Sequence, residues 1–213
     1  YVRQVPVPDG QATMRMYMIR IDPQTMSTVT VITFPIATAA DVAAFEKTPY
    51  AERIAAASTY DAIRIGASVD PNAPAIQFIA NASPDDTPIV ITHGQFVARV
   101  TQTANALHEL GVGPNDVVSF MLPLIPQAFF TLFGAEAAGI CNPVNPLLEP
   151  HQIAEILEAA NTKVLVALGP TPGADIWEKV QKVRGHLKNL KAILVVGGQA
   201  DEANGIYSFD ALV

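Results

Sequence analysis

The side chains in this sequence that could do chemistry are few and scattered. The chain has one cysteine, Cys141, and four histidines, none at the spacing of a metal-binding pair such as HExxH. Ser119 falls inside an apolar run that is typical of a buried strand, and no serine has the GxSxG surroundings of a hydrolase nucleophile. We therefore assign no catalytic residue and no metal ligand within this chain.

The glycine-rich segments do not match the known phosphate-binding loops. Gly111-Val-Gly113 is followed by Pro-Asn-Asp and lies between a predicted helix and a predicted strand, the reverse of the dinucleotide fingerprint. The loop that begins at Gly197-Gly198 lacks the lysine and the hydroxyl of GxxxxGK[ST]. A Rossmann-like oxidoreductase is disfavoured, and we interpret these segments as a helix end and a connecting loop.

Composition and charge exclude several classes of protein. Half of the 213 residues are hydrophobic and 15% are charged, which excludes wholesale disorder. The net charge of −7, without a run of Lys or Arg, argues against a nucleic-acid partner. Apolar stretches are shorter than the roughly 18 residues that span a bilayer, and no signal peptide is visible. With a single cysteine, which suits a reducing compartment, these features predict a cytoplasmic protein without a membrane span.

The segments that must position any site alternate between strands and helices. Because successive parallel strands need crossover connections, this order predicts an α/β fold, a layered parallel sheet with flanking helices. Turn-forming residues between residues 75–80 and 89–92 predict a short antiparallel hairpin before it. The predicted strands are 117–122, 140–144, 163–168 and 191–196, and the predicted helices are 93–110, 126–139, 151–160 and 175–187.

The helix from 93 to 110 carries the clearest boundary signals. Thr92 stands at the N-cap position, and Gln95, three residues later, completes a capping box. Gly111 follows as the C-terminal stop. An apolar stripe between these signals predicts that one face of the helix is buried.

The chain divides into an N-terminal extension with leader helices, 1–58, and an incomplete N-terminal α/β subdomain, 59–213. Residues 1–25 show neither helical nor strand periodicity and precede Met26, which resembles a natural start. Two interpretations of these residues stay open. They are upstream or introduced sequence, or they are a genuine N-terminal extension. Because the last residues, 209–213, read as the first turn of a helix, we expect the chain to be a fragment.

Two motifs in matching order carry a family resemblance over residues 59–213. The segment 91–123, which contains Gly111-Val-Gly-Pro-Asn-Asp116, resembles the opening of the large domain of the adenylate-forming (AMP-binding) superfamily. The segment Phe133-Gly-Ala-Glu-Ala-Ala-Gly-Ile-Cys-Asn-Pro-Val-Asn-Pro146 resembles that family's next motif, and residues 152–157 and 163–166 resemble the helix and strand after it. Among the members of this superfamily, the sequence most resembles a fatty-acyl-CoA synthetase.

The resemblance implies an acid–CoA ligase that activates a carboxylic, and by type a fatty, acid. Such enzymes use ATP with Mg²⁺ to form acyl-AMP and then transfer the acyl group to CoA. The phosphate loop, the adenine and ribose motifs and the C-terminal lysine of the family lie beyond this chain. We therefore expect the fragment alone to be inactive and to hold no cofactor, with carboxylate, ATP and CoA bound through the missing portion.

The same resemblance places one edge of this fragment near CoA. In relatives the loop after the strand 163–168 can approach the CoA nucleotide with arginines, but residues 169–177 here contain no basic residue. Trp177 and Lys179 are the two candidate CoA-binding residues. The alternative from another class is a non-catalytic α/β interaction module that holds a partner chain, and a homo-oligomer is left open.

Overall fold

The computed structural model describes residues 17–21, 28–33, 38–49, 52, 56–80, 83 and 85–213. The chain forms two compact units, Tyr1–Ala55 and Ala56–Val213. In the first unit, strands β1 (Tyr17–Ile21) and β2 (Thr28–Thr33) pair antiparallel. Helix α1 (Ala39–Glu46) follows, with the Thr38 and Asp41 side chains forming a capping box at its start.

Strand β1 lies within residues 1–25, the segment whose sequence shows neither helical nor strand periodicity. It is defined by its pairing with β2, which lies outside that segment. Residues 1–16, 22–25 and Met26 lie outside the described residues. The first leader helix ends before Pro49, as predicted, and most of the second lies outside the described residues.

The second unit begins with helix α3 (Thr59–Val69), whose first turn is capped by the Ser58 hydroxyl. Strands β3 (Pro74–Phe78) and β4 (Ile89–Thr92) then form the predicted antiparallel hairpin, with Gln77 opposite Val90. The predicted capping box opens helix α4 (His93–Glu109), where Thr92 Oγ1 accepts from the Gln95 amide at 3.2 Å. Gly111, at φ +81°, ends the helix in the left-handed conformation that glycine favours.

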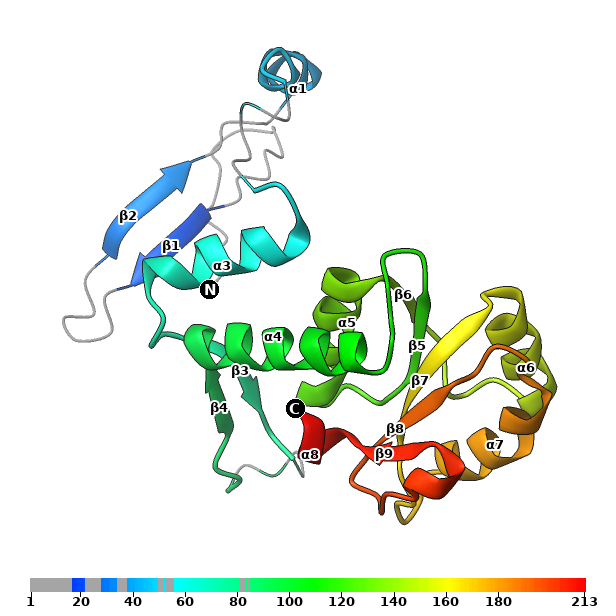
Figure 1. Ribbon diagram of the computed structural model, residues 1–213. Helices are drawn as coiled ribbons and strands as arrows, with labels where there is room; N and C mark the ends of the chain where they lie inside the picture. The colour runs from blue at the N-terminus through cyan, green and yellow to red at the C-terminus, as the bar shows by residue number, and fades with distance from the viewer. Residues whose placement is uncertain are drawn as a thin grey trace. The chain divides into compact units, whose positions relative to one another are not determined.

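A five-stranded parallel sheet forms the centre of this unit, which confirms the predicted α/β class (Figure 1). The strand order is β6-β5-β7-β8-β9, and every neighbouring pair is parallel. The sequence did not predict the edge strand β9, because three residues cannot show a pattern. The strands are β5 (Val117–Met121), β6 (Ile140–Pro143), β7 (Thr162–Leu168), β8 (Ala192–Val196) and β9 (Ile206–Ser208).

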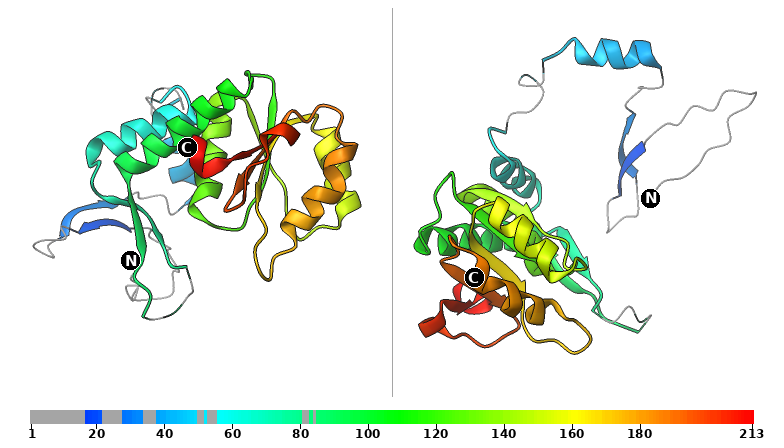
Figure 2. Two further views of the ribbon diagram at one scale, coloured as in Figure 1. Left: turned by 60° about the horizontal axis from the view of Figure 1, so that its bottom comes forward. Right: turned by 90° about the vertical axis from the view of Figure 1, so that its right-hand side faces the viewer.

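Helices cover both faces of the sheet (Figures 1 and 2). Alternation along β7 divides the core, because Val164 and Val166 pack with α4 and α5 whereas Leu165 and Ala167 pack with α6 and α7. The central strands β7 and β8 therefore present apolar side chains to both faces, as is typical of a covered parallel sheet. The helices are α5 (Pro126–Ala138), α6 (Pro150–Ala159), α7 (Ile176–Val183) and α8 (Phe209–Leu212).

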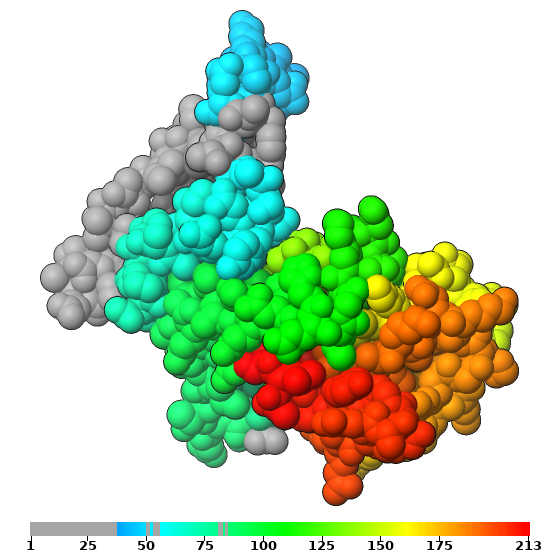
Figure 3. Space-filling model, in the orientation of Figure 1, coloured from blue at the N-terminus to red at the C-terminus, as the bar shows by residue number. Residues whose placement is uncertain are grey.

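One helix ends differently from its prediction. The helix predicted over 175–187 is α-helical only to Val183 and continues as the 3-10 turn η1 (Arg184–His186). A second 3-10 turn, η2 (Glu202–Asn204), precedes β9 and is separate from any predicted helix. On one surface α8 lies beside α4 (Figure 3). Arg99 of α4 donates a hydrogen bond to the Val213 carbonyl. No helix in the described part of the chain is both long and apolar enough to cross a bilayer.

Candidate functional site

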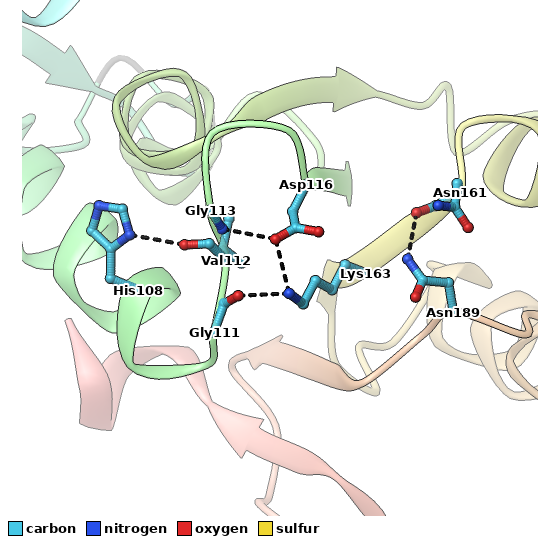
Figure 4. A network of polar contacts seen from close by, with 8 residues as sticks. All are labelled: His108, Gly111, Val112, Gly113, Asp116, Asn161, Lys163 and Asn189. Atoms are coloured by element: carbon cyan, nitrogen blue, oxygen red, sulfur yellow. Dashed lines mark hydrogen bonds and ion pairs between the residues drawn. The ribbon is translucent and has the colours of Figure 1, made fainter.

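A polar network fixes the turn between α4 and β5 at the amino edge of the sheet (Figure 4). The Lys163 ammonium, carried by β7, donates to the Gly111 carbonyl at 2.6 Å and to Asp116 Oδ2 at 2.8 Å. The same carboxylate oxygen accepts from the Gly113 amide at 2.8 Å. The lysine hydrogen bond, followed by the amide hydrogen bond, lowers the pKa of Asp116 below its ordinary value.

This network is structural. Open parallel sheets bind ligands at the opposite edge, where the carboxyl ends of the strands lie. All three hydrogen bonds of Asp116 and Lys163 are made within the fold, to one another and to the turn before β5. The Gly111–Asp116 motif therefore serves to attach helix α4 to the sheet.

Ser119 is a buried structural residue, as the sequence predicted. Its side chain lies in the centre of β5 with no exposed surface. Its hydroxyl is 2.7 Å from the Thr162 hydroxyl of β7 and accepts from the Asn142 amide of β6 at 2.9 Å. The three polar side chains satisfy one another across three adjacent strands, which leaves Ser119 unable to reach a substrate.

Cys141 is protected from ionisation. Burial, with a smaller contribution from the negative charge of Glu136, raises the pKa of the thiol to about 12. Since the thiolate is the nucleophile and the metal ligand, the neutral thiol on β6 is suited to neither role. Among the described residues, no group of three or more His, Cys, Asp or Glu side chains could hold a metal ion.

The carboxyl edge of the sheet carries two clefts. One, the hairpin cleft, has a volume of about 470 Å³ and lies between the β3–β4 hairpin and helices α4, α5 and α8. Its walls are mainly apolar, with Phe78, Ile91, Phe130 and Phe209 among the residues that line it. Arg99 supplies the cationic side chain in this cleft, and its Nη1 already donates to Val213 and Gln102.

The other, which we call the loop cleft, has a volume of about 570 Å³ and is formed by the loops after β7 and β8. It is lined by Pro170, Trp177, Gln181, Ile206 and the loop 197–201. Trp177 is half-buried, because its indole also packs against the core cluster beneath α6 and α7. This is the structural setting of the first of the two candidate CoA-binding residues.

Two glycines allow the loops of this cleft to meet. A Cβ atom on Gly169 would lie 2.8 Å from the Gly198 Cα, and one on Gly198 would collide with the Val195 side chain. The Gly169 amide donates to the Val196 carbonyl at 2.8 Å, so the loops are joined where they leave β7 and β8. The contact explains why glycine follows both strands.

Lys179, the second candidate, does not line the loop cleft. Its ammonium donates to the Pro146 carbonyl at 2.9 Å and forms an ion pair with Asp175 at 3.1 Å. Two residues apart on a helix, Trp177 and Lys179 point in different directions, and the structure does not bring them together. Lys179 holds α7 against the loop that follows β6.

Sequence reasoning missed the loop 197–201 and Gln181 as partners of Trp177. It treated 197–201 as a connecting loop only. The available signal was the parallel sheet itself, because loops that leave neighbouring parallel strands lie at the same edge. The pairing of β7 with β8 brings the two loops together.

Known proteins similar to this chain include CoA ligases. A marinolic acid–CoA ligase of a Pseudoalteromonas species is 29% identical over 163 residues, which cover 76% of this chain and 25% of that protein. The anthranilate–CoA ligase AuaEII, solved with anthranoyl-AMP, is 25% identical with a TM-score of 0.61, over 73% of this chain and 27% of that one. The chain spans about a quarter of the length of these relatives.

A further solved structure supports the fold. The acetoacetyl-CoA synthetase of Streptomyces lividans matches with a TM-score of 0.65 and 24% identity, over 73% of this chain and 24% of that one. Residues 64–211 match the family described as AMP-binding enzyme, a range that runs from helix α3 to helix α8. Because this match covers more than half of the chain, the chain belongs to the AMP-binding enzyme family.

Proposed function

We propose that this chain is the N-terminal part of a longer acid–CoA ligase that acts on a fatty acid. In the first step a carboxylate oxygen attacks the α-phosphorus of ATP, forming acyl-AMP and releasing pyrophosphate. In the second step the CoA sulfur attacks the acyl carbonyl, and AMP leaves. The observation that supports this proposal is the family match over residues 64–211, with the two sequence motifs on the helix–strand pairs α4–β5 and α5–β6.

The part played by these residues is to build the scaffold. Stabilising a transferred adenylyl group needs cations and hydrogen-bond donors directed at the developing charge. The described residues show no acidic cluster for Mg²⁺. The contribution of the metal is therefore assigned to no residue described here, and we expect the isolated chain to be inactive. A cytoplasmic location belongs to the same proposal and is supported by the single cysteine.

The loop cleft is the proposed contact with CoA, through Trp177. The indole offers an apolar, flat surface beside the glycine-containing loop 197–201. Lys179 has a positioning role in this proposal, because its ammonium is held by Pro146 and Asp175. The assignment therefore keeps one of the two sequence candidates as a ligand contact.

The test compares the product of the complete gene with the 213-residue chain. The complete protein should release pyrophosphate from ATP when supplied with a fatty acid and Mg²⁺, and should form acyl-CoA when CoA is added. The 213-residue chain should show no heat of binding when titrated with ATP and Mg²⁺. Micromolar ATP binding by the short chain, or a complete protein that forms no acyl-adenylate from any carboxylic acid, would contradict the proposal.

A further inference from the structure

The sequence contains a single asparagine that is followed by glycine, Asn204 before Gly205. Asparagine is among the thermally labile residues of proteins, because the backbone nitrogen of the next residue can attack its side-chain amide. Glycine in that next position has no Cβ atom to block the approach. Asn204 is exposed and is the last residue of the 3-10 turn η2, just before β9. The dipeptide therefore has the chemistry of a spontaneous modification site.

The reaction needs only water and hydroxide. The Gly205 nitrogen gives its proton to hydroxide and forms a bond to Cγ of Asn204. The bond from Cγ to Nδ2 then breaks, and Nδ2 takes a proton from water and leaves as ammonia, which closes a succinimide ring. Water opens either carbonyl of this ring, which gives aspartate or isoaspartate, the latter with an extra methylene group in the backbone. In total one water is added and one ammonia is lost.

In the folded chain both reacting groups are already engaged in hydrogen bonds. The Gly205 amide, which would be the nucleophile, donates to the Glu202 carbonyl at 3.0 Å. The side-chain nitrogen of Asn204, which would be the leaving group, donates to Asp201 Oδ2 at 2.7 Å. Deprotonating the nucleophile gives up the first hydrogen bond, and the loss of ammonia gives up the second. Both steps are therefore more costly than in an unfolded chain.

The charge of Asp201 also opposes the reaction. Negative charge develops on the attacking nitrogen and then on the side-chain oxygen of Asn204. The Asp201 carboxylate, hydrogen-bonded to the same side chain, repels that charge. Arg184 is the cation on this dipeptide, and its Nη2 donates to the backbone carbonyl of Asn204 at 2.7 Å rather than to the side chain.

The backbone around the dipeptide is closed into a turn. Asp201 and Ile206 exchange two backbone hydrogen bonds, of 2.8 and 3.0 Å, and we call residues 201–206 the β9 turn. The Gly205 carbonyl accepts from the Ile193 amide of β8 at 2.9 Å, which attaches this turn to the sheet. Ring closure needs the nitrogen and Cγ in a reactive arrangement, so the β9 turn must first open.

We propose that Asn204 is a modification site controlled by the fold. The closed β9 turn protects the amide, and opening of the turn permits its conversion. Isoaspartate then lengthens the backbone inside a turn whose ends are joined at Asp201 and Ile206, so the turn cannot close with the same hydrogen bonds. Modification therefore releases β9 from the edge of the sheet. This chemistry belongs to the chain itself and does not depend on the reaction of a ligase.

The rate of conversion tests the protection. The 213-residue chain is incubated in mildly alkaline buffer, with and without concentrated guanidinium chloride. Digested samples are analysed by chromatography and mass spectrometry for aspartate and isoaspartate at position 204. We expect conversion to be at least about tenfold slower in the folded chain, because local opening must come first. Equal rates in the folded and unfolded chain would overturn the proposal.

A variant of the partner residue tests the cause of the protection. Asp201→Ala removes both the hydrogen-bond acceptor and the charge, and should raise the rate at Asn204 in buffer by about threefold or more. In guanidinium chloride the rate should not change. Asp70→Ala is the matched control, because the Asp70 carboxylate also holds an exposed turn, by accepting from the Asn72 amide at 3.1 Å. Equal rates at Asn204 for the two variants in buffer would contradict the role of Asp201.

Hydrogen exchange tests the effect of the product. Chains that carry isoaspartate at position 204 are separated by chromatography, returned to buffer and compared with the unmodified chain. Peptides that contain Ile206 and Ile193 should exchange faster, because their amides lose the bonds of the β9 turn. Peptides from β5, which is a neighbour of neither β8 nor β9, should keep their protection. Unchanged exchange at Ile206 would show that the modification does not release the edge strand.

Discussion

The ammonium nitrogen of Lys163 lies 2.8 Å from a carboxylate oxygen of Asp116, and each residue stands at the amino end of one of two neighbouring strands. Asp116 directly precedes β5, and Lys163 is the second residue of β7. The ion pair therefore joins the turn after α4 to the strand next to β5. It couples the helical layer to the sheet through two side chains that are 47 residues apart in sequence.

Asp116→Asn should lower the melting temperature, and the size of the effect should depend on pH. The folded state lowers the pKa of Asp116, so its carboxylate stabilises the fold above the unfolded pKa of about 3.9, and this contribution is lost as the pH falls through the lower folded value. The difference in the free energy of unfolding between wild type and variant should be complete at pH 7 and shrink below pH ~4.

Urea unfolding followed by circular dichroism at several pH values measures that difference. Lys188→Met is the matched control, because Lys188 forms an ion pair with Glu158 at 3.5 Å while its side chain is 89% exposed. Its removal should change stability by less than ~0.5 kcal/mol. A pH-independent effect of Asp116→Asn would show that the carboxylate charge is not the source of the stability.

Gly134→Ala should destabilise the protein although alanine is the better helix former. Gly134 lies where α5 crosses α4, and a Cβ atom there would be 2.6 Å from the Thr103 Cβ. Overpacking of this kind costs about 1–3 kcal/mol, which exceeds the ~1 kcal/mol gained in helix propensity. Gly66→Ala on α3 is the control, because nothing lies within 4 Å of its added Cβ, and it should be neutral or stabilising. Equal unfolding midpoints for the two variants would contradict the close helix contact.

Ser119→Ala should cost about 1–3 kcal/mol, because Asn142 and Thr162 each lose the partner that satisfies them. Adding Thr162→Val should recover part of that loss, since it removes the hydroxyl that Ser119→Ala leaves unpaired. Ser68→Ala provides the control on an exposed helix surface, where the hydroxyl bonds only to the Ile65 carbonyl. Chemical denaturation of the three variants gives their free energies of unfolding. An effect of Ser119→Ala no larger than that of Ser68→Ala would contradict a structural role for Ser119.

The central sheet was predictable because β5, β7 and β8 are predominantly apolar runs, and the segments between the strands show apolar residues at helical spacing. Thr92 with Gln95 and the stop at Gly111 are local features, so sequence alone located α4. Strands β1, β2 and β9 were missed. Strand β9 has only three residues, and β1 and β2 lie outside the alternating order of strands and helices, so each is defined by its partner in a sheet, and pairing is not a local property.

The candidate site was only partly predictable. The family resemblance suggested Trp177 and Lys179 as candidates, but the sequence could not show that Lys179 finds its partner 33 residues earlier, at Pro146. It also could not show that the loop 197–201 meets the loop after β7. Both facts depend on which strands are neighbours in the sheet, information that is present only in the folded chain.

Cys141 should react slowly with iodoacetamide in the folded protein. Burial and Glu136 raise the pKa of its thiol to about 12, so at pH 8 only about one molecule in 10⁴ carries the thiolate that reacts. Because an exposed thiol has a pKa of about 8.5, alkylation in urea should be at least about a hundredfold faster. Glu136→Gln removes the smaller of the two causes and should modestly increase the rate in the folded state. Mass spectrometry of quenched samples gives the rates, and equal rates in the folded and unfolded protein would show that the thiol ionises freely.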